Sequence, residues 1–205
     1  MAYTNKTVFE TDLAAAGLTD TTLDFESQTA GDLIPSGSSA GGITFTYNFG
    51  GATILVDNLF ETTSPTNYLG TDDAGLFLDG DDFDLSFAPV NAIGMFFITA
   101  DFMFNGDIEL TVNGVTASLA TADVSFLPLG DQVYFLGLID DMNTFTTASI
   151  TTLGLGAFFY NVDDIVLASA AAGPMVPVPE PASAPLFLVG LIGLWAASRR
   201  WRPAQ

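Results

Sequence analysis

The side chains of this chain that could take part in chemistry are almost all carboxylates. Asp and Glu account for 24 of the 205 residues, whereas histidine and cysteine are absent. The chain therefore has no cysteine nucleophile, no serine–histidine pair and no zinc site built from thiolates or imidazoles. Catalysis would have to use carboxylates, hydroxyl groups or Lys6, and a hard cation would have to bind through oxygen atoms.

The densest group of carboxylates is Asp79-Gly80-Asp81-Asp82-Phe83-Asp84, which follows Asp72-Asp73. It does not follow the EF-hand pattern, because the twelfth position counted from Asp79 is Val90 rather than Glu. Two interpretations stay open for this group: a solvated turn, or a looser Ca²⁺ site at an acidic loop tip.

The elements that must position these residues are short strands. Residues 43–49 place apolar side chains at alternate positions, and residues 92–99 form a nearly continuous apolar run that is typical of a central strand. Asn113-Gly114 separates two alternating segments, 108–112 and 115–119, which predicts a two-residue hairpin turn. Further strands are expected at 23–26, 53–56, 83–87, 133–139, 146–151, 155–160 and 165–168. The pattern predicts an all-β fold, an antiparallel β-sandwich or jelly roll, over residues 20–168.

A short N-terminal helix is expected within residues 1–19. Phe9, Leu13 and Ala16 recur at helical spacing, and Gly17 provides a stop. Thr7 is the expected cap of this helix, with Glu10 completing a capping box.

A second group of carboxylates depends on this fold. The first and last strands of a jelly roll are often neighbours, so Glu26 is expected to lie near Asp163 and Asp164. Carboxylates that are brought together repel each other unless a cation or a hydrogen-bond donor compensates. Glu26, Asp163 and Asp164 are therefore the candidate metal ligands and Ca²⁺ the candidate cofactor, the alternative being that Asp163 only caps a turn.

Glycosidase chemistry would need two carboxylates facing each other across a sugar, roughly 5–9.5 Å apart. Nothing in the local sequence pairs Glu26, Glu61 or Glu109, and Glu109 is expected to face solvent from a strand. We therefore predict no catalytic site. Several aromatic residues could stack on sugar rings, although aromatic side chains on strands usually belong to the core: Tyr47, Phe49, Tyr68, Tyr134, Phe158 and Tyr160.

The charge of the chain excludes nucleic acid as a partner. The net charge is −20, and residues 1–179 hold one lysine against 23 carboxylates, a net charge of −22. Such a body is repelled by phosphate backbones.

The C-terminal residues have a different composition. A Pro- and Ala-rich linker is expected at 169–181, and an uninterrupted apolar segment at 186–197 is followed by Arg199, Arg200 and Arg202. Counted over 182–202, this segment predicts a short membrane-type helix with a basic end that stays cytoplasmic, which places the acidic body on the outer side.

This tail closely resembles the PEP-CTERM sorting signal of Gram-negative bacteria. The resemblance covers residues 176–202 and is carried by Val178-Pro179-Glu180-Pro181-Ala182, the apolar helix and Arg199-Arg200. It implies processing by an exosortase, a membrane protease-transpeptidase that acts near Pro-Glu-Pro, after transient anchoring in the inner membrane. Family members normally begin with a secretory signal, and none is recognisable at residues 1–6, so we expect a clipped start or a fragment.

The body more loosely resembles the lectin-like β-sandwich ectodomains of such proteins, in which a structural Ca²⁺ often lies between the terminal strands. The matching pieces are Asp24-Phe25-Glu26, residues 91–97 and residues 160–165. Together these features predict an exported protein of the cell envelope, surface or exopolysaccharide matrix with a structural or adhesion role. The alternative is a carbohydrate-binding module that engages extracellular polysaccharide.

Overall fold

The computed structural model describes residues 1–153 and 158–170. The described residues belong to one compact unit, which begins at Met1. The predicted sorting helix at 182–202, with the linker from residue 171 onward, lies outside the described residues. Within the described part of the chain, no helix is long and apolar enough to cross a membrane.

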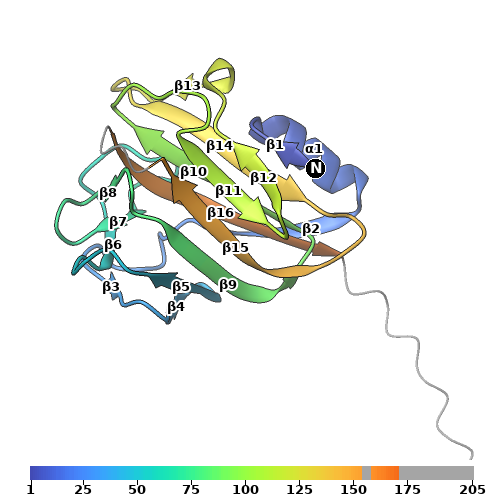
Figure 1. Cartoon of the computed structure of the whole chain (residues 1–205), viewed down its shortest axis with the longest axis horizontal. Helices are drawn as coiled ribbons and strands as arrows, with labels where there is room; N and C mark the ends of the chain where they lie inside the picture. The colour runs from blue at the N-terminus through green and yellow to red at the C-terminus, as the bar shows by residue number, and fades with distance from the viewer. Residues whose placement is uncertain (154–157, 171–205) are drawn as a thin grey trace, which may run out of the picture. The chain divides into compact units, whose positions relative to one another are not determined.

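Two antiparallel sheets form the body (Figure 1), which confirms the predicted all-β antiparallel fold. The first sheet has the order β1 (Ala2–Tyr3), β14 (Gln132–Ile139), β10 (Ala92–Thr99), β16 (Phe159–Ala170), β7 (Tyr68–Thr71), β6 (Ile54–Asp57) and β3 (Leu33–Ile34). Three more strands join it, β13 (Ser125–Phe126) on β14, and β2 (Leu18–Leu23) and β8 (Phe77–Leu78) on β16. The second sheet has the order β12 (Val115–Ser118), β11 (Ile108–Val112), β15 (Phe145–Thr152), β9 (Phe83–Val90), β5 (Ile43–Tyr47) and β4 (Ser38–Ala40). A 3₁₀ turn covers Thr121–Asp123.

The core lies between the two sheets and follows from the alternation seen in the sequence. Phe45 and Leu85 of the second sheet and Ile93 and Tyr160 of the first are fully buried in one apolar cluster. The predicted hairpin is confirmed: Val112 pairs with Val115, and Asn113 and Gly114 both have positive φ, 49° and 78°, as a type I′ turn requires.

Helix α1 (Lys6–Ala15) packs on the outer face of the first sheet through Phe9 and Leu13. Its N-cap is Asn5, whose side chain accepts a hydrogen bond from the Val8 amide, so the prediction of Thr7 as the cap was wrong. The helix therefore begins two residues earlier than the capping-box pattern indicated.

A facing pair of glycines makes room for this helix. Gly94 and Gly137 are cross-strand partners, and a Cβ on Gly137 would lie 2.7 Å from Phe9 Cδ2. The Phe9 ring, 5.1 Å from that of Phe135, therefore rests directly on the backbone of the sheet.

The other end of the same outer face is covered by residues 58–67, which connect β6 to β7. Asn161 and Asp163 of β16 are almost completely buried there, although both are polar. Alternation explains this burial, because Tyr160 and Val162 point into the core and their neighbours point to the outer face.

Two predicted segments differ from the structure around this loop. The strand expected at 23–26 ends at Leu23, and Phe25 takes the left-handed conformation with φ of 59°. Residues 159–160 and 165–168, which were expected in two separate strands, belong to the single strand β16. A bulge interrupts its pairing with β10 between Gly94 and Phe96, where Asp164 has φ of 50°.

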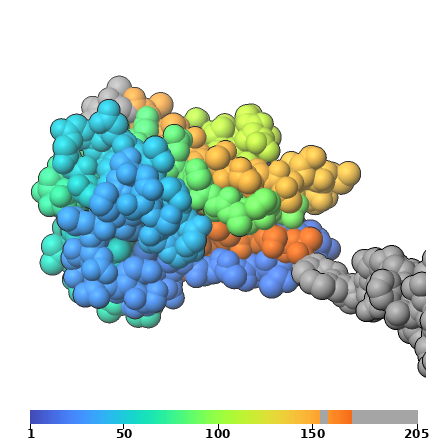
Figure 2. All heavy atoms as spheres, turned by 90° about the horizontal axis from the view of Figure 1, so that it is seen from below, coloured from blue at the N-terminus to red at the C-terminus, as the bar shows by residue number. Residues whose placement is uncertain are grey.

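Strand β16 runs from one end of the body to the other. Ala170 pairs with Leu18 where the strand ends, whereas Phe159 pairs with Leu78 at its start. In Figure 2 the end of β16, in orange, lies against β2, in blue, and the early loops gather at the opposite end. The body thus has a loop end near Phe159 and an exit end near Ala170.

Candidate functional site

Glu26 is held by the loop of residues 58–67. Its Oε1 accepts hydrogen bonds from the amides of Thr66 (2.8 Å) and Asn67 (2.7 Å), and its Oε2 accepts one from the Thr66 hydroxyl (2.7 Å). Burial opposes ionisation, but hydrogen bonds from Asn67, Thr66 and Ser64 outweigh it and lower the pKa of Glu26 to about 2. Glu26 is therefore a carboxylate whose charge is already compensated by donors.

Asp163 is bound by the same loop. Its Oδ2 accepts hydrogen bonds from the hydroxyls of Thr62 and Thr63 and from the Ser64 amide, and its Oδ1 accepts one from the Asp164 amide. Burial nevertheless raises the pKa of Asp163 to about 6, since the hydrogen bonds from Thr62 and Ser64 oppose the shift only in part and the Asp164 charge adds to it. Asp163 therefore titrates at a higher pH than an ordinary aspartate.

Ser64 joins the two carboxylates. Its amide donates to Asp163, and its hydroxyl lies 3.1 Å from Glu26 Oε1. The expectation that the folded chain brings Glu26 near Asp163 is thus realised through the loop between them. Sequence reasoning did not find this loop, because its polar residues carry no periodicity.

Asp164 completes the group at the bulge of β16. Burial raises its pKa; Thr63 and Lys6 lower it, and the charges of Asp24 and Glu26 raise it again. Asp164 and Phe25, the neighbour of Glu26, both take the left-handed conformation, and such backbone strain is often held at functional positions.

Hydrogen bonds from residues 62–67 thus supply the compensation that a cation was expected to give Glu26 and Asp163. Within residues 1–153 and 158–170, no group of three or more acidic side chains is arranged to hold a metal ion. Calcium binding through Glu26, Asp163 and Asp164 stays a prediction.

The carboxylates at residues 72–84 accept hydrogen bonds from backbone amides, one within a local turn and two from other segments of the chain. Asp72 accepts from the Thr53 amide, Asp81 from the Leu78 amide and Asp82 from the Thr152 amide. Burial raises the pKa of Asp81, with added repulsion from Asp73 and Asp82. Each of these three carboxylates thus binds a backbone amide of its own.

Glu61 and Glu109 are on separate elements. Glu61 accepts from the Leu129 amide, at 2.9 Å to Oε1, and Glu109 accepts from the Ser118 hydroxyl across the β11–β12 pair. Glu109 thus lies on a strand, as expected, and is partly exposed.

Four of the six aromatic residues that the sequence offered for sugar stacking are buried: Tyr68, Tyr134, Phe158 and Tyr160. Tyr47 and Phe49 are partly buried and stack on each other, with ring centroids 4.4 Å apart. The exposed aromatic residues of the described chain are others, and most lie in loops: Phe60, Phe102, Phe104, Phe126 and Phe159.

A cleft of about 260 Å³ opens at the loop end of the body. Its apolar lining comes from the ends of β10 and β16 and from two loops: Phe60, Leu76, Ile98, Ala100 and Phe159. Its polar lining consists of Thr99, Asp101, Asp131 and Asn161. Burial, and then the charge of Glu61, raise the pKa of Asp131.

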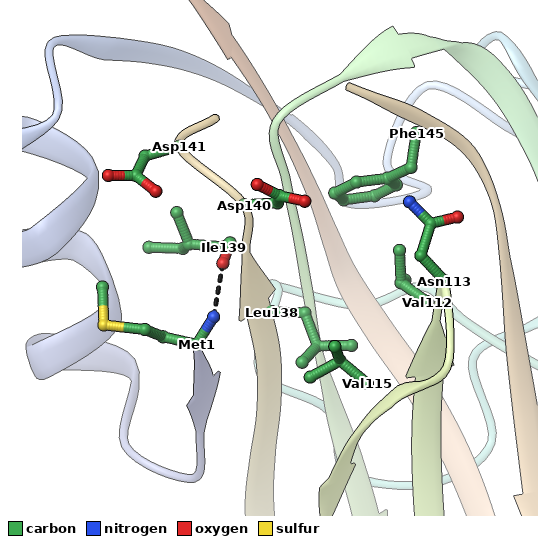
Figure 3. A pocket seen from close by; sticks show the side chains of 9 residues that line it. All are labelled: Met1, Val112, Asn113, Val115, Leu138, Ile139, Asp140, Asp141 and Phe145. Atoms are coloured by element: carbon green, nitrogen blue, oxygen red, sulfur yellow. Dashed lines mark hydrogen bonds between the residues drawn. The ribbon is translucent and has the colours of Figure 1, made fainter. Parts of the chain in front are cut away.

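A smaller pocket of about 120 Å³ lies at the exit end, between Met1 and the Asn113 turn (Figure 3). Asp140 and Asp141 stand at its rim, and the Met1 amine donates to the Ile139 carbonyl at 2.5 Å. Hydrogen bonds from the Asn143 and Met142 amides lower the pKa of Asp140. This carboxylate thus closes its own turn, and the larger cleft is the stronger candidate for a ligand.

Comparison with known sequences identifies the tail. The family model of the PEP-CTERM protein-sorting motif matches residues 177–202, a range that includes Pro179-Glu180-Pro181 and Arg199-Arg200. This match confirms the resemblance seen in the sequence and indicates an exported, surface-directed protein. No curated protein matches the chain.

Comparison with solved structures finds distant β-sandwich domains. The K2 cleaved adhesin domain of Lys-gingipain has a TM-score of 0.45 at 11% identity, covering 73% of this chain and 99% of its own. The CBM22-1 xylan-binding domain of a Paenibacillus barcinonensis protein has a TM-score of 0.36 at 14% identity, covering 71% of this chain and 100% of its own. A family 29 carbohydrate-binding module has a TM-score of 0.30 at 15% identity, covering 78% and 99%. These similarities are too distant to assign a ligand.

Proposed function

The chain carries a PEP-CTERM sorting motif, and from this premise we propose that it is an exosortase-processed protein of the cell surface or exopolysaccharide matrix with a structural or adhesion role. The motif is the observation that carries this proposal. Its tail would anchor the chain in the inner membrane before processing.

The properties of the body support this role. Its apolar residues pack between the two sheets and beneath α1, and its carboxylates are held by hydroxyl and amide donors. A net charge of −22 over residues 1–179 favours solubility outside the cell.

Sorting is tested in a Gram-negative host that has an exosortase, with the chain behind a secretory leader of that host. Antibody labelling of intact cells should detect the wild-type body at the surface or in the matrix fraction. Replacing Pro179, Glu180 and Pro181 by alanine should abolish this labelling, whereas Pro174→Ala, just outside the motif, should not. Equal labelling of all three chains would contradict the proposal.

The second candidate function is binding of extracellular polysaccharide. It is favoured by the cleft at the loop end, where Phe60 and Phe159 are 45% and 44% exposed beside carboxylate and amide groups. Rigid aromatic walls with a few polar groups are typical of small-ligand sites.

A further inference from the structure

The cleft at the loop end contains a buried acceptor that is not used by the protein. Asn161 is only 1% exposed, and its Nδ2 donates to the Glu61 carbonyl at 3.0 Å. This bond fixes the orientation of the amide, because a flipped side chain would place Oδ1 against that carbonyl. The Oδ1 atom has no hydrogen-bond partner, although leaving a buried acceptor unpaired is costly.

The other polar groups of the cleft also offer acceptors. No described residue donates a hydrogen bond to the Asp131 carboxylate, whereas Asp101 Oδ2 accepts one from the Phe159 amide at 2.8 Å. The Thr99 hydroxyl donates its proton to the Phe159 carbonyl at 2.6 Å, so it too can only accept from a ligand. A complementary ligand must therefore donate hydrogen bonds, as the hydroxyl groups of a sugar do.

Charge restricts the ligand further. Glu61 lies close enough to Asp131 to raise its pKa, and the one basic residue in the described chain, Lys6, lies over the Phe96 ring and pairs with Glu10. An anionic polysaccharide would meet carboxylates without a compensating cation. A neutral ligand avoids this repulsion.

The walls of the cleft fit the apolar face of a sugar ring. Phe60 and Phe159 expose about half of their surface, and Ile98 and Leu76 extend the apolar lining. With a volume of about 260 Å³, the cleft suits one ring rather than a long chain segment. Five of its nine lining residues are apolar, which favours an organic ligand over a bare cation.

The exposed apolar residues beside the cleft extend this surface. Phe102 is 89% exposed in the loop that follows β10, and this loop is tied to β14 because Gln132 Nε2 donates to the Asp101 carbonyl at 2.8 Å. Phe126 of β13 is 66% exposed, and it is the cross-strand partner of the same Gln132. Neighbouring units of a polymer could therefore contact further aromatic side chains.

The position of the cleft agrees with a tethered protein. Phe159 and Asn161 are at the start of β16, and Ala170 is its last residue. At about 3.3 Å per residue, the strand separates the cleft from the exit by roughly 35 Å. A body attached through its C-terminal side would present the cleft away from the attachment.

We propose that the loop-end cleft, defined by Phe60, Phe159, Asp101, Asp131 and Asn161, binds one ring of a neutral saccharide. The sugar hydroxyls donate to the two carboxylates and, after a small shift of the side chains that cover it, to Asn161 Oδ1, and the ring packs between the phenylalanines. This inference rests on the second candidate function. It does not depend on sorting, because binding is measured on purified protein.

The test uses the full 205-residue chain in a detergent without a sugar headgroup. Affinity electrophoresis through gels that contain neutral polysaccharides (a glucan, a galactan and a mannan) or anionic ones (alginate and polygalacturonate) is combined with saturation-transfer NMR of the monosaccharides. A neutral polymer should retard the chain and an anionic one should not.

Two variants locate the site. Phe159→Ala and Asp131→Asn should each weaken retardation on the order of tenfold. Met142→Ala and Asp141→Asn make similar changes at the exit end and should leave it unchanged; Met142 is 82% exposed there. Circular dichroism confirms that all four variants are folded.

Absence of retardation by every neutral polymer would overturn the proposal. So would retardation that the cleft variants leave intact, or that Asp141→Asn abolishes, since the latter would locate binding at the pocket beside Met1. Calcium titration is the remaining arm: binding of CaCl₂ alone, lost in Asp131→Asn, would identify a cation site instead. A chain that binds sugar but is not labelled at the cell surface would refute the sorting proposal and leave this one standing.

Discussion

The pH dependence of folding tests the account of the buried carboxylates most closely, through Asp163. This side chain is fully buried, and its pKa is raised from 3.8 to about 6. Between these values the unfolded chain has lost the proton and the folded chain keeps it. The free energy of unfolding therefore falls as the pH rises through this window.

The rise from 3.8 to about 6 corresponds to roughly 3 kcal/mol in the free energy of unfolding. This stabilisation is fully present below pH 3.8 and is lost above pH 6. The sequence isoelectric point is about 4.1, so soluble protein is best measured at higher pH. From pH 5 to pH 7.5, Asp163 alone should lower the free energy of unfolding by about 1.4 kcal/mol.

Urea unfolding of the wild type and of Asp163→Asn, followed by circular dichroism in EDTA, gives this slope directly. Between pH 5 and pH 7.5, the free energy of unfolding of the variant should fall by about 1.4 kcal/mol less than that of the wild type. Asp20→Asn, an exposed change on the strand beside β16, should retain the wild-type slope. A wild-type slope that Asp163→Asn leaves unchanged would show that the donors around Asp163 outweigh its burial, and would exclude a raised pKa for this carboxyl.

Three other predictions concern stability and are checked by urea or thermal unfolding. Glu26→Ala should lower the free energy of unfolding by about 2 kcal/mol, because the Thr66 amide loses its acceptor. Glu26→Gln keeps one acceptor oxygen and should lower it by about half as much. Equal losses in the two variants would show that Glu26 does not hold the loop. Gly137→Ala should cost about 1–3 kcal/mol, because its Cβ would lie 2.7 Å from the Phe9 ring, and an unchanged midpoint would show that the ring moves freely. Calcium should raise the melting temperature more than NaCl of equal ionic strength does, because it relieves repulsion at Asp164. The Asp164→Asn variant should show no difference between the two salts. Equal shifts in the wild type would eliminate the proposed cation site.

The sequence was most informative where strands are regular. Alternation at residues 43–47 and the apolar run at 92–99 reflect burial of one or both strand faces, so they predicted β5 and β10. Asn113-Gly114 predicted its turn because both residues accept positive φ.

The sequence was least informative where distant segments meet. Tyr68–Thr71 was missed as a strand, and the donors of residues 62–67 have no pattern that points to Glu26 or Asp163. Phe25 takes a left-handed conformation that its residue type disfavours, so the strand expected at 23–26 ended early.

The loop-end cleft could not be predicted either. Its lining residues come from segments as far apart as Phe60 and Asn161, and only the packing of residues 58–67 over the outer face brings them together. The proximity of Glu26 to Asp163 could be predicted, because the first and last strands of the expected fold are neighbours, as β2 and β16 are in the structure.

The central claim, that the tail is a sorting signal removed during export, is tested most directly by the intact mass of the exported protein. In a host with an exosortase, the mature chain should lack the apolar segment and Arg199-Arg200 and end near Pro179-Glu180-Pro181. In the same host without its exosortase gene, the chain should keep the whole tail. A mature protein that retains Arg199-Arg200 when the exosortase is present would contradict the claim.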